Sequence, residues 1–134
     1  MNGNSERHIR VFVVDRHDAV RRALSMRLNA PENFDVVGDV ADPLAASSQI
    51  DIAKPDVVVL GLHRSSDEEF AKTVHAVYEM ANNTAIVIVL VPFADAIERE
   101  LLLDAGAKRY LLKQIDSNQL IHEIESAYLR PASV

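Results

Sequence analysis

Short apolar runs alternate along the chain with longer segments in which apolar residues return every three or four positions. Runs of four to seven residues rich in Val, Ile, Leu and Phe are typical of β-strands, and the wider spacing is typical of amphipathic helices. The apolar runs predict strands at residues 9–14, 34–40, 57–60, 85–90 and 109–112. The spaced segments predict a helix after each strand.

Capping residues indicate where these helices begin and end. The predicted helices run from Asp18 to just before Pro31, over 43–54, from Ser66 or Asp67 through Ala81, over 95–105 and over 116–129. We expect Asp18 to be an N-cap, Gly106 to end the fourth helix, and Asp116 with Gln119 to form a capping box. The helical residues expected to face the sheet are Val20, Ala23, Leu24, Leu28, Leu44, Ile50, Ala53, Phe70, Val74, Val77, Ala81, Leu120, Ile121, Ile124 and Ala127.

Regular alternation of strands and helices predicts an α/β fold with a doubly wound five-stranded parallel sheet. We expect strand order 2-1-3-4-5, a flavodoxin-like three-layer sandwich, with the first and third strands side by side at the switch point. Residues 57–60 are apolar on both parities, which fits a central strand covered on both faces. Ligands of such sheets bind beyond the carboxyl ends of the strands, where Gly61 follows the third strand.

Composition narrows the class of protein. The 134 residues are enough for one compact domain, predicted at 9–129, with a flexible tail at 1–8 and a tail or linker at 130–134. The net charge of −6 argues against non-specific nucleic-acid binding by this domain. The chain has no cysteine, no signal-peptide pattern and no apolar stretch of membrane-spanning length, so we expect a cytoplasmic location and no membrane partner.

Four motifs occur in a characteristic order: Ile-Arg-Val-Phe-Val-Val-Asp at 9–15, Phe-Asp-Val-Val-Gly at 34–38, Pro-Asp-Val-Val-Val-Leu at 55–60 and Ala-Gly-Ala-Lys-Arg-Tyr-Leu-Leu-Lys at 105–113. Together they resemble the receiver domains of bacterial two-component response regulators. Residues 36–38 and 110–113 are most similar to receivers fused to a LuxR-type helix-turn-helix. The resemblance covers residues 9–129.

The resemblance implies a phosphotransfer site, which this sequence alters. Receivers take a phosphoryl group onto an aspartate that ends the third strand, and Mg²⁺, a hydroxyl and a lysine assist. The two acidic positions after the first strand correspond to Asp15 and Arg16, and the phosphoacceptor position corresponds to Gly61. The hydroxyl position corresponds to Val91, the lysine to Lys113, the aromatic switch residue to Tyr110, and the proline that often follows the lysine to Gln114.

These replacements predict a degenerate receiver that is neither phosphorylated nor able to bind Mg²⁺. A unit charge about 5 Å away, at an effective dielectric of about 20, is worth roughly 3 kcal/mol against another unit charge and about twice that against Mg²⁺. Asp15 and Arg16 nearly cancel, and Lys113 adds a positive charge. Gly61 offers no nucleophile. We therefore expect no phosphoacceptor, no catalytic residue, no cofactor and no metal ion.

The retained residues leave alternatives open. Asp15 is expected to be a buried carboxylate paired with Lys113 or Arg16. Arg16 either reaches into the vacated metal position or points to solvent, and Tyr110 is either a packing residue or a moving switch.

Two histidines near the same edge of the sheet could form a metal-binding site. His17 and His63 are either solvated loop residues or, with Asp15, Asp18 or Asp67, ligands of zinc or nickel.

Leu101, Leu102 and Leu103 indicate a binding surface. Three consecutive helical residues span about 200° around the axis, so at least one should be exposed or lie in an interface. We expect a homodimer.

The sequence therefore predicts a non-enzymatic receiver-like domain that serves signalling by interaction and dimerisation, independently of phosphorylation, in transcriptional control. A DNA-binding domain, fused or separate, or another signalling protein is the expected partner. No helix-turn-helix lies within these residues, so the chain is either a stand-alone domain or part of a longer protein. One alternative is a sensor that uses the vacated pocket, either for a metal ion or for a small ligand that replaces phosphate, with Arg16 and Lys113 as the cationic anchors of the small ligand. Another is phosphotransfer to an unusual acceptor, Ser65, Ser66 or Asp67.

Overall fold

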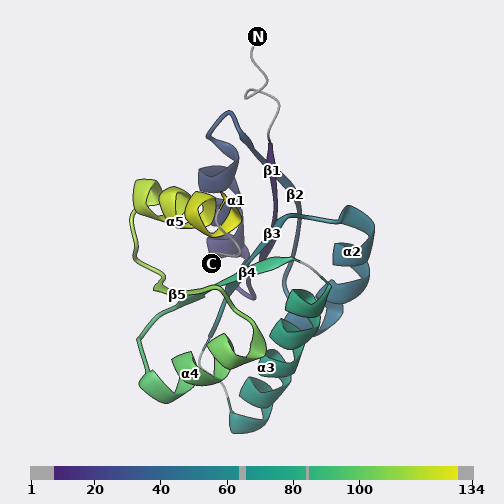
Figure 1. Ribbon diagram of the computed structural model, residues 1–134, viewed down its shortest axis with the longest axis vertical. Helices are drawn as coiled ribbons and strands as arrows, with labels where there is room; N and C mark the ends of the chain where they lie inside the picture. The colour runs from purple at the N-terminus through teal and green to yellow at the C-terminus, as the bar shows by residue number, and fades with distance from the viewer. Residues whose placement is uncertain (1–7, 64–65, 84, 130–134) are drawn as a thin grey trace.

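Strands and helices alternate throughout the computed structural model, which describes residues 8–63, 66–83 and 85–129 (Figure 1). The elements are β1 (Ile9–Val14), α1 (Asp18–Asn29), β2 (Phe34–Val40), the 3₁₀ turn η2 (Pro43–Ala45), α2 (Ala46–Ala53), β3 (Val57–Gly61), α3 (Asp67–Asn82), β4 (Ile86–Val91), α4 (Ala96–Ala105), β5 (Arg109–Leu112) and α5 (Ser117–Leu129). Most boundaries lie within a residue of those predicted. The predicted tails lie outside the described residues except for His8.

The five strands form one parallel sheet in the order β2-β1-β3-β4-β5, which confirms the predicted flavodoxin-like topology. β1 and β3 are neighbours, and Val14 pairs with Leu60. The residues that follow, Asp15 and Gly61, therefore leave the sheet side by side at its carboxyl edge.

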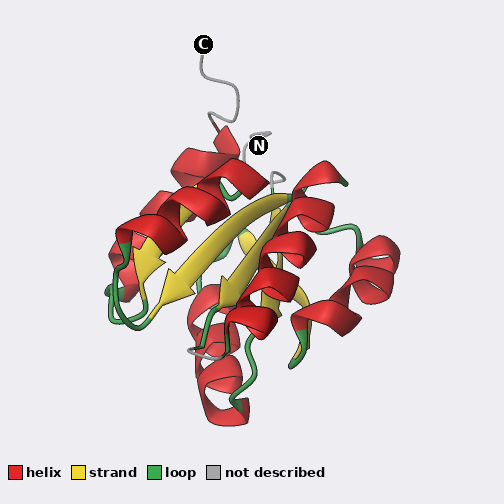
Figure 2. Ribbon diagram, turned by 90° about the horizontal axis from the view of Figure 1, so that it is seen from below, coloured by secondary structure: helices red, strands yellow, loops and turns green. Residues whose placement is uncertain are grey.

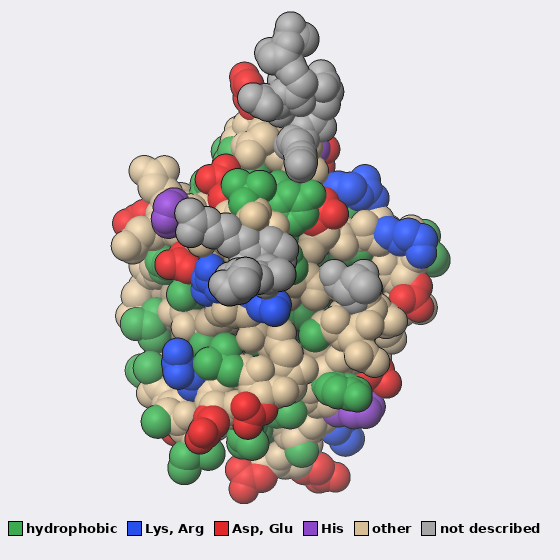
Figure 3. Space-filling model, viewed as in Figure 1, with side chains coloured by type: hydrophobic (Ala, Val, Ile, Leu, Met, Phe, Trp, Pro, Cys, Tyr) green, Lys and Arg blue, Asp and Glu red, His purple; other side chains and the backbone are tan. Residues whose placement is uncertain are grey.

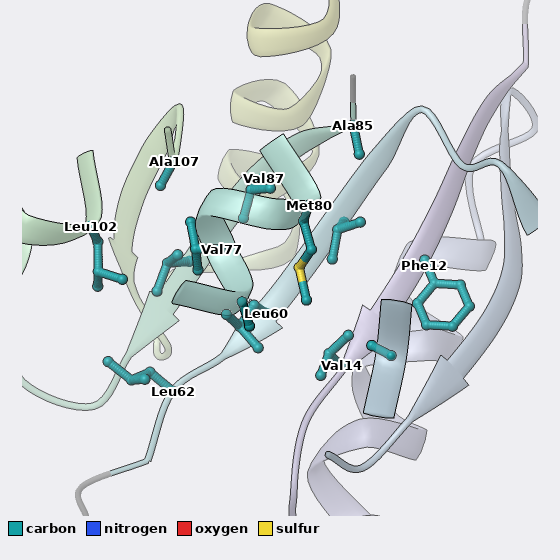
Figure 4. Packing of buried hydrophobic residues seen from close by; sticks show 14 of the residues in the cluster. Phe12, Val14, Leu60, Leu62, Val77, Met80, Ala85, Val87, Leu102 and Ala107 are labelled. Atoms are coloured by element: carbon teal, nitrogen blue, oxygen red, sulfur yellow. The ribbon is translucent and has the colours of Figure 1, made fainter. Parts of the chain in front are cut away.

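Helices cover both faces of the sheet and give three layers (Figure 2). On one face α1 and α5 contribute Leu24, Leu28, Leu120, Ile124 and Ala127 to a core with Ile9, Val11, Val13, Phe34, Val57, Val59, Ile88 and Leu90. On the other face α2, α3 and α4 contribute Ala46, Ile50, Ala76, Val77, Met80 and Leu102 to a core with Phe12, Val14, Val58, Leu60, Val87, Val89 and Val91 (Figure 4). The central strand β3 is therefore buried on both of its faces, as its composition predicted.

Side-chain caps hold three of the helices at their N-termini. Ser66, Asp95 and Asp116 each accept a hydrogen bond from the backbone three residues ahead, at 3.1, 2.9 and 2.9 Å. Gly106 ends α4 with φ of 122°, a conformation that favours glycine. In the part of the chain described, no helix has the length and apolar character needed to cross a membrane.

Three predictions about the helices are wrong. His17, not Asp18, is the N-cap of α1, and Asp18 is its first residue, where its carboxylate pairs with Arg21 at 2.8 Å. Val20 and Ala23 are exposed, because the face of α1 that packs on the sheet is the one that carries Leu24 and Leu28. Leu44 is exposed because residues 43–45 form a separate 3₁₀ turn before α2.

Candidate functional site

Asp15 is the centre of the candidate site, at the carboxyl edge of the sheet. Its side chain is 1% exposed. Oδ1 accepts a hydrogen bond from the backbone N–H of His17 at 2.9 Å and lies 2.9 Å from Nε2 of His63. Oδ2 lies 3.3 Å from the ammonium of Lys113. The segments that follow β1, β3 and β5 thus converge on one buried carboxylate, and the predicted pairing of Asp15 is with Lys113 rather than Arg16.

Gly61, the last residue of β3, leaves the space that this carboxylate fills. A Cβ atom built on Gly61 would overlap with Oδ2 of Asp15 and would lie 2.9 Å from its Cγ. Asp15 in this conformation and any side chain at position 61 therefore exclude each other. The absence of a side chain on Gly61 also allows Asp15 to turn toward Lys113.

His63 belongs to the site, so its interpretation as a solvated loop histidine is wrong. Its side chain is only 19% exposed, and its Nε2 lies 3.1 Å from Lys113 as well as beside Asp15. Burial lowers the pKa of His63 below its ordinary value, and this outweighs the opposing effect of the Asp15 carboxylate. Burial thus favours the neutral form of this imidazole. The adjacency of the first and third strands was the signal that could have indicated this pairing.

Arg16 lies outside the polar cluster and is exposed, so of its two predicted placements the one toward solvent is confirmed and the one in the vacated metal position is wrong. Its guanidinium pairs with Glu69 of α3 at 3.1 Å, and both side chains are about half exposed. Asp18 likewise turns away, toward Arg21. Lys113 is therefore the cation that balances Asp15. His17 is exposed, and its ring packs edge-on against that of His63 at 4.1 Å between centroids.

The β4 and β5 ends complete the edge. Val91 is buried and offers only its carbonyl, which accepts a hydrogen bond from the backbone N–H of Lys113 at 2.8 Å. Gln114 is exposed. Tyr110 is half-buried and donates from its hydroxyl to Glu98 at 2.6 Å, which ties β5 to α4. Burial and the Glu98 carboxylate raise the pKa of Tyr110 to about 12. These contacts support its interpretation as a packing residue.

The three consecutive leucines of α4 have different environments. Leu101 is 45% exposed, Leu103 is half-buried and Leu102 is fully buried. At least one exposed leucine was expected, and this is confirmed. Leu102 as an interface residue is wrong, because it packs inside the core beneath α4. Ile97, one turn before Leu101, is 72% exposed, and we call Ile97 and Leu101 the α4 patch.

A groove of about 400 Å³ separates α3 from α4 and reaches His63. Its walls combine apolar Phe70 with the α4 patch, and three acidic residues, Asp67, Asp95 and Glu98, lie among them. Figure 3 shows acidic and hydrophobic side chains mixed over α4 and the beginning of α3. The predicted acceptor Ser66 caps α3 instead, and Ser65 lies outside the described residues.

The doubly wound sheet, the buried aspartate after β1 and the lysine after β5 define the receiver class of α/β domains. Residues 11–125 match the family of the response regulator receiver domain. The chain belongs to this family.

Relatives of known sequence agree with this assignment. The chain is 32% identical over 120 residues to the oxygen regulatory protein NreC of Staphylococcus epidermidis, covering 90% of this chain and 55% of that protein. It is 27% identical over 113 residues to the uncharacterized transcriptional regulatory protein YhcZ of Bacillus subtilis, covering 84% and 52%. The chain thus spans about half the length of these relatives.

Two solved structures share the fold. The receiver domain of the putative response regulator NarL from Mycobacterium tuberculosis has a TM-score of 0.77 at 24% identity, covering 91% of this chain and 97% of that one. The response regulator domain of Thermotoga maritima CheB also has a TM-score of 0.77 at 24% identity, covering 92% and 98%.

Proposed function

We propose that this chain is the receiver module of a LuxR-type transcriptional regulator and that it signals through binding in one fixed conformation, without phosphorylation. The observation that supports this most directly is the position of Asp15. Its carboxylate fills the space that a side chain at position 61 needs, and Lys113 lies 3.3 Å away. Gly61 supplies no acceptor carboxylate for the family reaction, and Asp15 occupies the space that such a side chain would need.

The charges of the pocket support the same proposal. Mg²⁺ prefers several hard oxygen ligands in octahedral geometry. Asp15 provides a carboxylate whose two oxygens already contact His17, His63 and Lys113. The ammonium of Lys113 stands beside the carboxylate and opposes a second cation, so millimolar Mg²⁺ should leave the melting temperature unchanged.

The experiment is phosphorylation by acetyl phosphate in the presence of Mg²⁺, read by intact-protein mass spectrometry. We expect no base-labile mass gain of one phosphate. A receiver domain that has an aspartate at the acceptor position and is known to react with acetyl phosphate, treated in the same buffer, controls for the activity of the reagent. A one-phosphate adduct on this chain would contradict the proposal.

The relatives support the transcriptional part of the proposal. One of them is described as a transcriptional regulatory protein, and the chain covers about half its length. Binding would use the α4 patch or the α5 side, and a closed two-fold homodimer is the commonest assembly for a protein that presents an exposed apolar patch such as Ile97 and Leu101.

A second candidate function is the sensing of a metal ion or small ligand at the same pocket. The two imidazoles beside the Asp15 carboxylate favour it. Arg16 does not contribute to it, since it pairs with Glu69.

A further inference from the structure

Three possible metal ligands meet where β1 and β3 end. A carboxylate oxygen of Asp15 and one ring nitrogen each of His17 and His63 all lie within 4.8 Å of one another. Asp15 is buried, His63 is half-buried and His17 is exposed, so the group forms a path from the core of the edge to solvent. Ligands of a tetrahedral zinc site lie roughly 3.3 Å apart. Small side-chain rotations therefore bring these three atoms to coordinating distance.

The contacts of His63 Nε2 are in conflict with one another. This nitrogen lies 2.9 Å from Oδ1 of Asp15, which can only accept a hydrogen bond, and 3.1 Å from the ammonium of Lys113, which can only donate one. A single imidazole nitrogen cannot donate and accept at once. One of the two contacts is therefore unfavourable in either tautomer. A metal ion removes the conflict, because it takes the lone pairs of both Nε2 and the carboxylate.

We propose that Asp15, His17 and His63 together bind one divalent transition-metal ion of the Zn²⁺ class. Two imidazoles and one carboxylate suit Zn²⁺, Ni²⁺ or Co²⁺ rather than Mg²⁺. Three protein ligands leave a position for water or for a further ligand. The side chain of His17 makes no capping hydrogen bond although His17 is the N-cap of α1, and its ring already packs against that of His63.

Lys113 is the competitor at this site. Its ammonium stands 3.3 Å from Asp15 and 3.1 Å from His63, so it must move away when a cation binds. A bound ion would join the segments after β1 and β3 and release Lys113 from both. The proposal rests on the second candidate function, and it does not depend on whether the domain is phosphorylated.

The test is calorimetric titration of the tag-free 134-residue chain with Zn²⁺, with Mg²⁺ in parallel, followed by thermal unfolding with and without the ion. We expect one Zn²⁺ per chain and a melting temperature raised by roughly 8 °C at a hundredfold excess over Kd. His17→Ala and His63→Gln should each weaken binding at least ~10-fold. His122→Gln, at an exposed histidine of α5, is the matched control and should leave it unchanged. Lys113→Met should tighten binding about tenfold or more, because it removes the competing charge.

Several results would overturn the proposal. These are the absence of saturable binding, binding that only one of the two histidine variants weakens, and binding that His122→Gln weakens as much as they do. Because His17 is exposed, His17→Ala keeps the test valid even if His63→Gln fails to fold. A phosphate adduct in the acetyl phosphate experiment would contradict the proposed function and leave the titration result intact.

Discussion

Gly61→Ala should be unusually destabilising for the addition of one methyl group. The new Cβ would overlap with Oδ2 of Asp15, so the carboxylate must leave its contacts with Lys113 and His63. Gly61 has no left-handed φ angle, so backbone strain makes no contribution. In a site without this overlap, Gly→Ala would stabilise the fold by about 0.4–1 kcal/mol.

The expected loss follows from the environment of Asp15. Removing one partner from a buried ion pair costs about 3–5 kcal/mol. The side chains of Lys113 and His63 keep 20% and 19% of their surface exposed, which places the cost near the lower end. Against the small gain from replacing glycine, the net loss in free energy of unfolding should be about 2–3 kcal/mol.

A double-mutant cycle separates this overlap from other effects. Urea unfolding would be measured for the wild type, Gly61→Ala, Asp15→Ala and the double variant, with m-values compared to verify two-state behaviour. Since Asp15→Ala clears the space, Gly61→Ala should be neutral or slightly stabilising in that background, and the coupling energy should be about 3 kcal/mol. Equal costs of Gly61→Ala in both backgrounds would refute the steric reasoning.

Other predictions concern α4 and Tyr110. Leu101→Asp should keep the circular dichroism of the wild type and convert a dimer to monomers in sedimentation equilibrium, whereas Leu102→Asp should reduce the free energy of unfolding by more than ~4 kcal/mol because Leu102 is fully buried. A wild type that is monomeric at high micromolar concentration would contradict the dimer. Because the pKa of Tyr110 is raised to about 12, the folded state holds the phenolic proton more tightly than the unfolded state. This contribution to stability is full below about pH 10 and is lost as pH rises to about 12, and urea unfolding across this range should show a smaller loss in Tyr110→Phe.

The strands could be predicted because they are continuous apolar runs, and the apolar residues of both parities in β3 place it inside the sheet. The order 2-1-3-4-5 was one choice among doubly wound sheets, and the structure confirms it. The end of α4 was equally legible, since Gly106 has the left-handed φ that glycine allows. The exposure of one of three consecutive leucines followed from helical geometry alone. Which of the three lies inside did not, because this depends on the rotation of α4 about its axis.

The polar contacts of the site could be predicted only in part. Asp15 pairs with residues 48 and 98 positions away, and Arg16 with a residue 53 positions away. The sequence pattern places these residues on neighbouring loops, but it does not determine the side-chain rotamers and therefore not which side chains pair. The pairing of Arg16 with Glu69 and the burial of His63 both depend on rotamers, and neither was predicted.

The carboxylate of Asp15 in the space above Gly61 also constrains which sequences can be reached from this one by single substitutions. Gly61→Asp alone would place a second carboxylate where the first already lies, with steric overlap and like-charge repulsion together. Under the proposed function, a phosphorylatable pocket would need further changes at Arg16 and Val91 before the new aspartate became useful. The first step is therefore harmful by itself, and mutational history should run more easily away from phosphoryl transfer than back toward it.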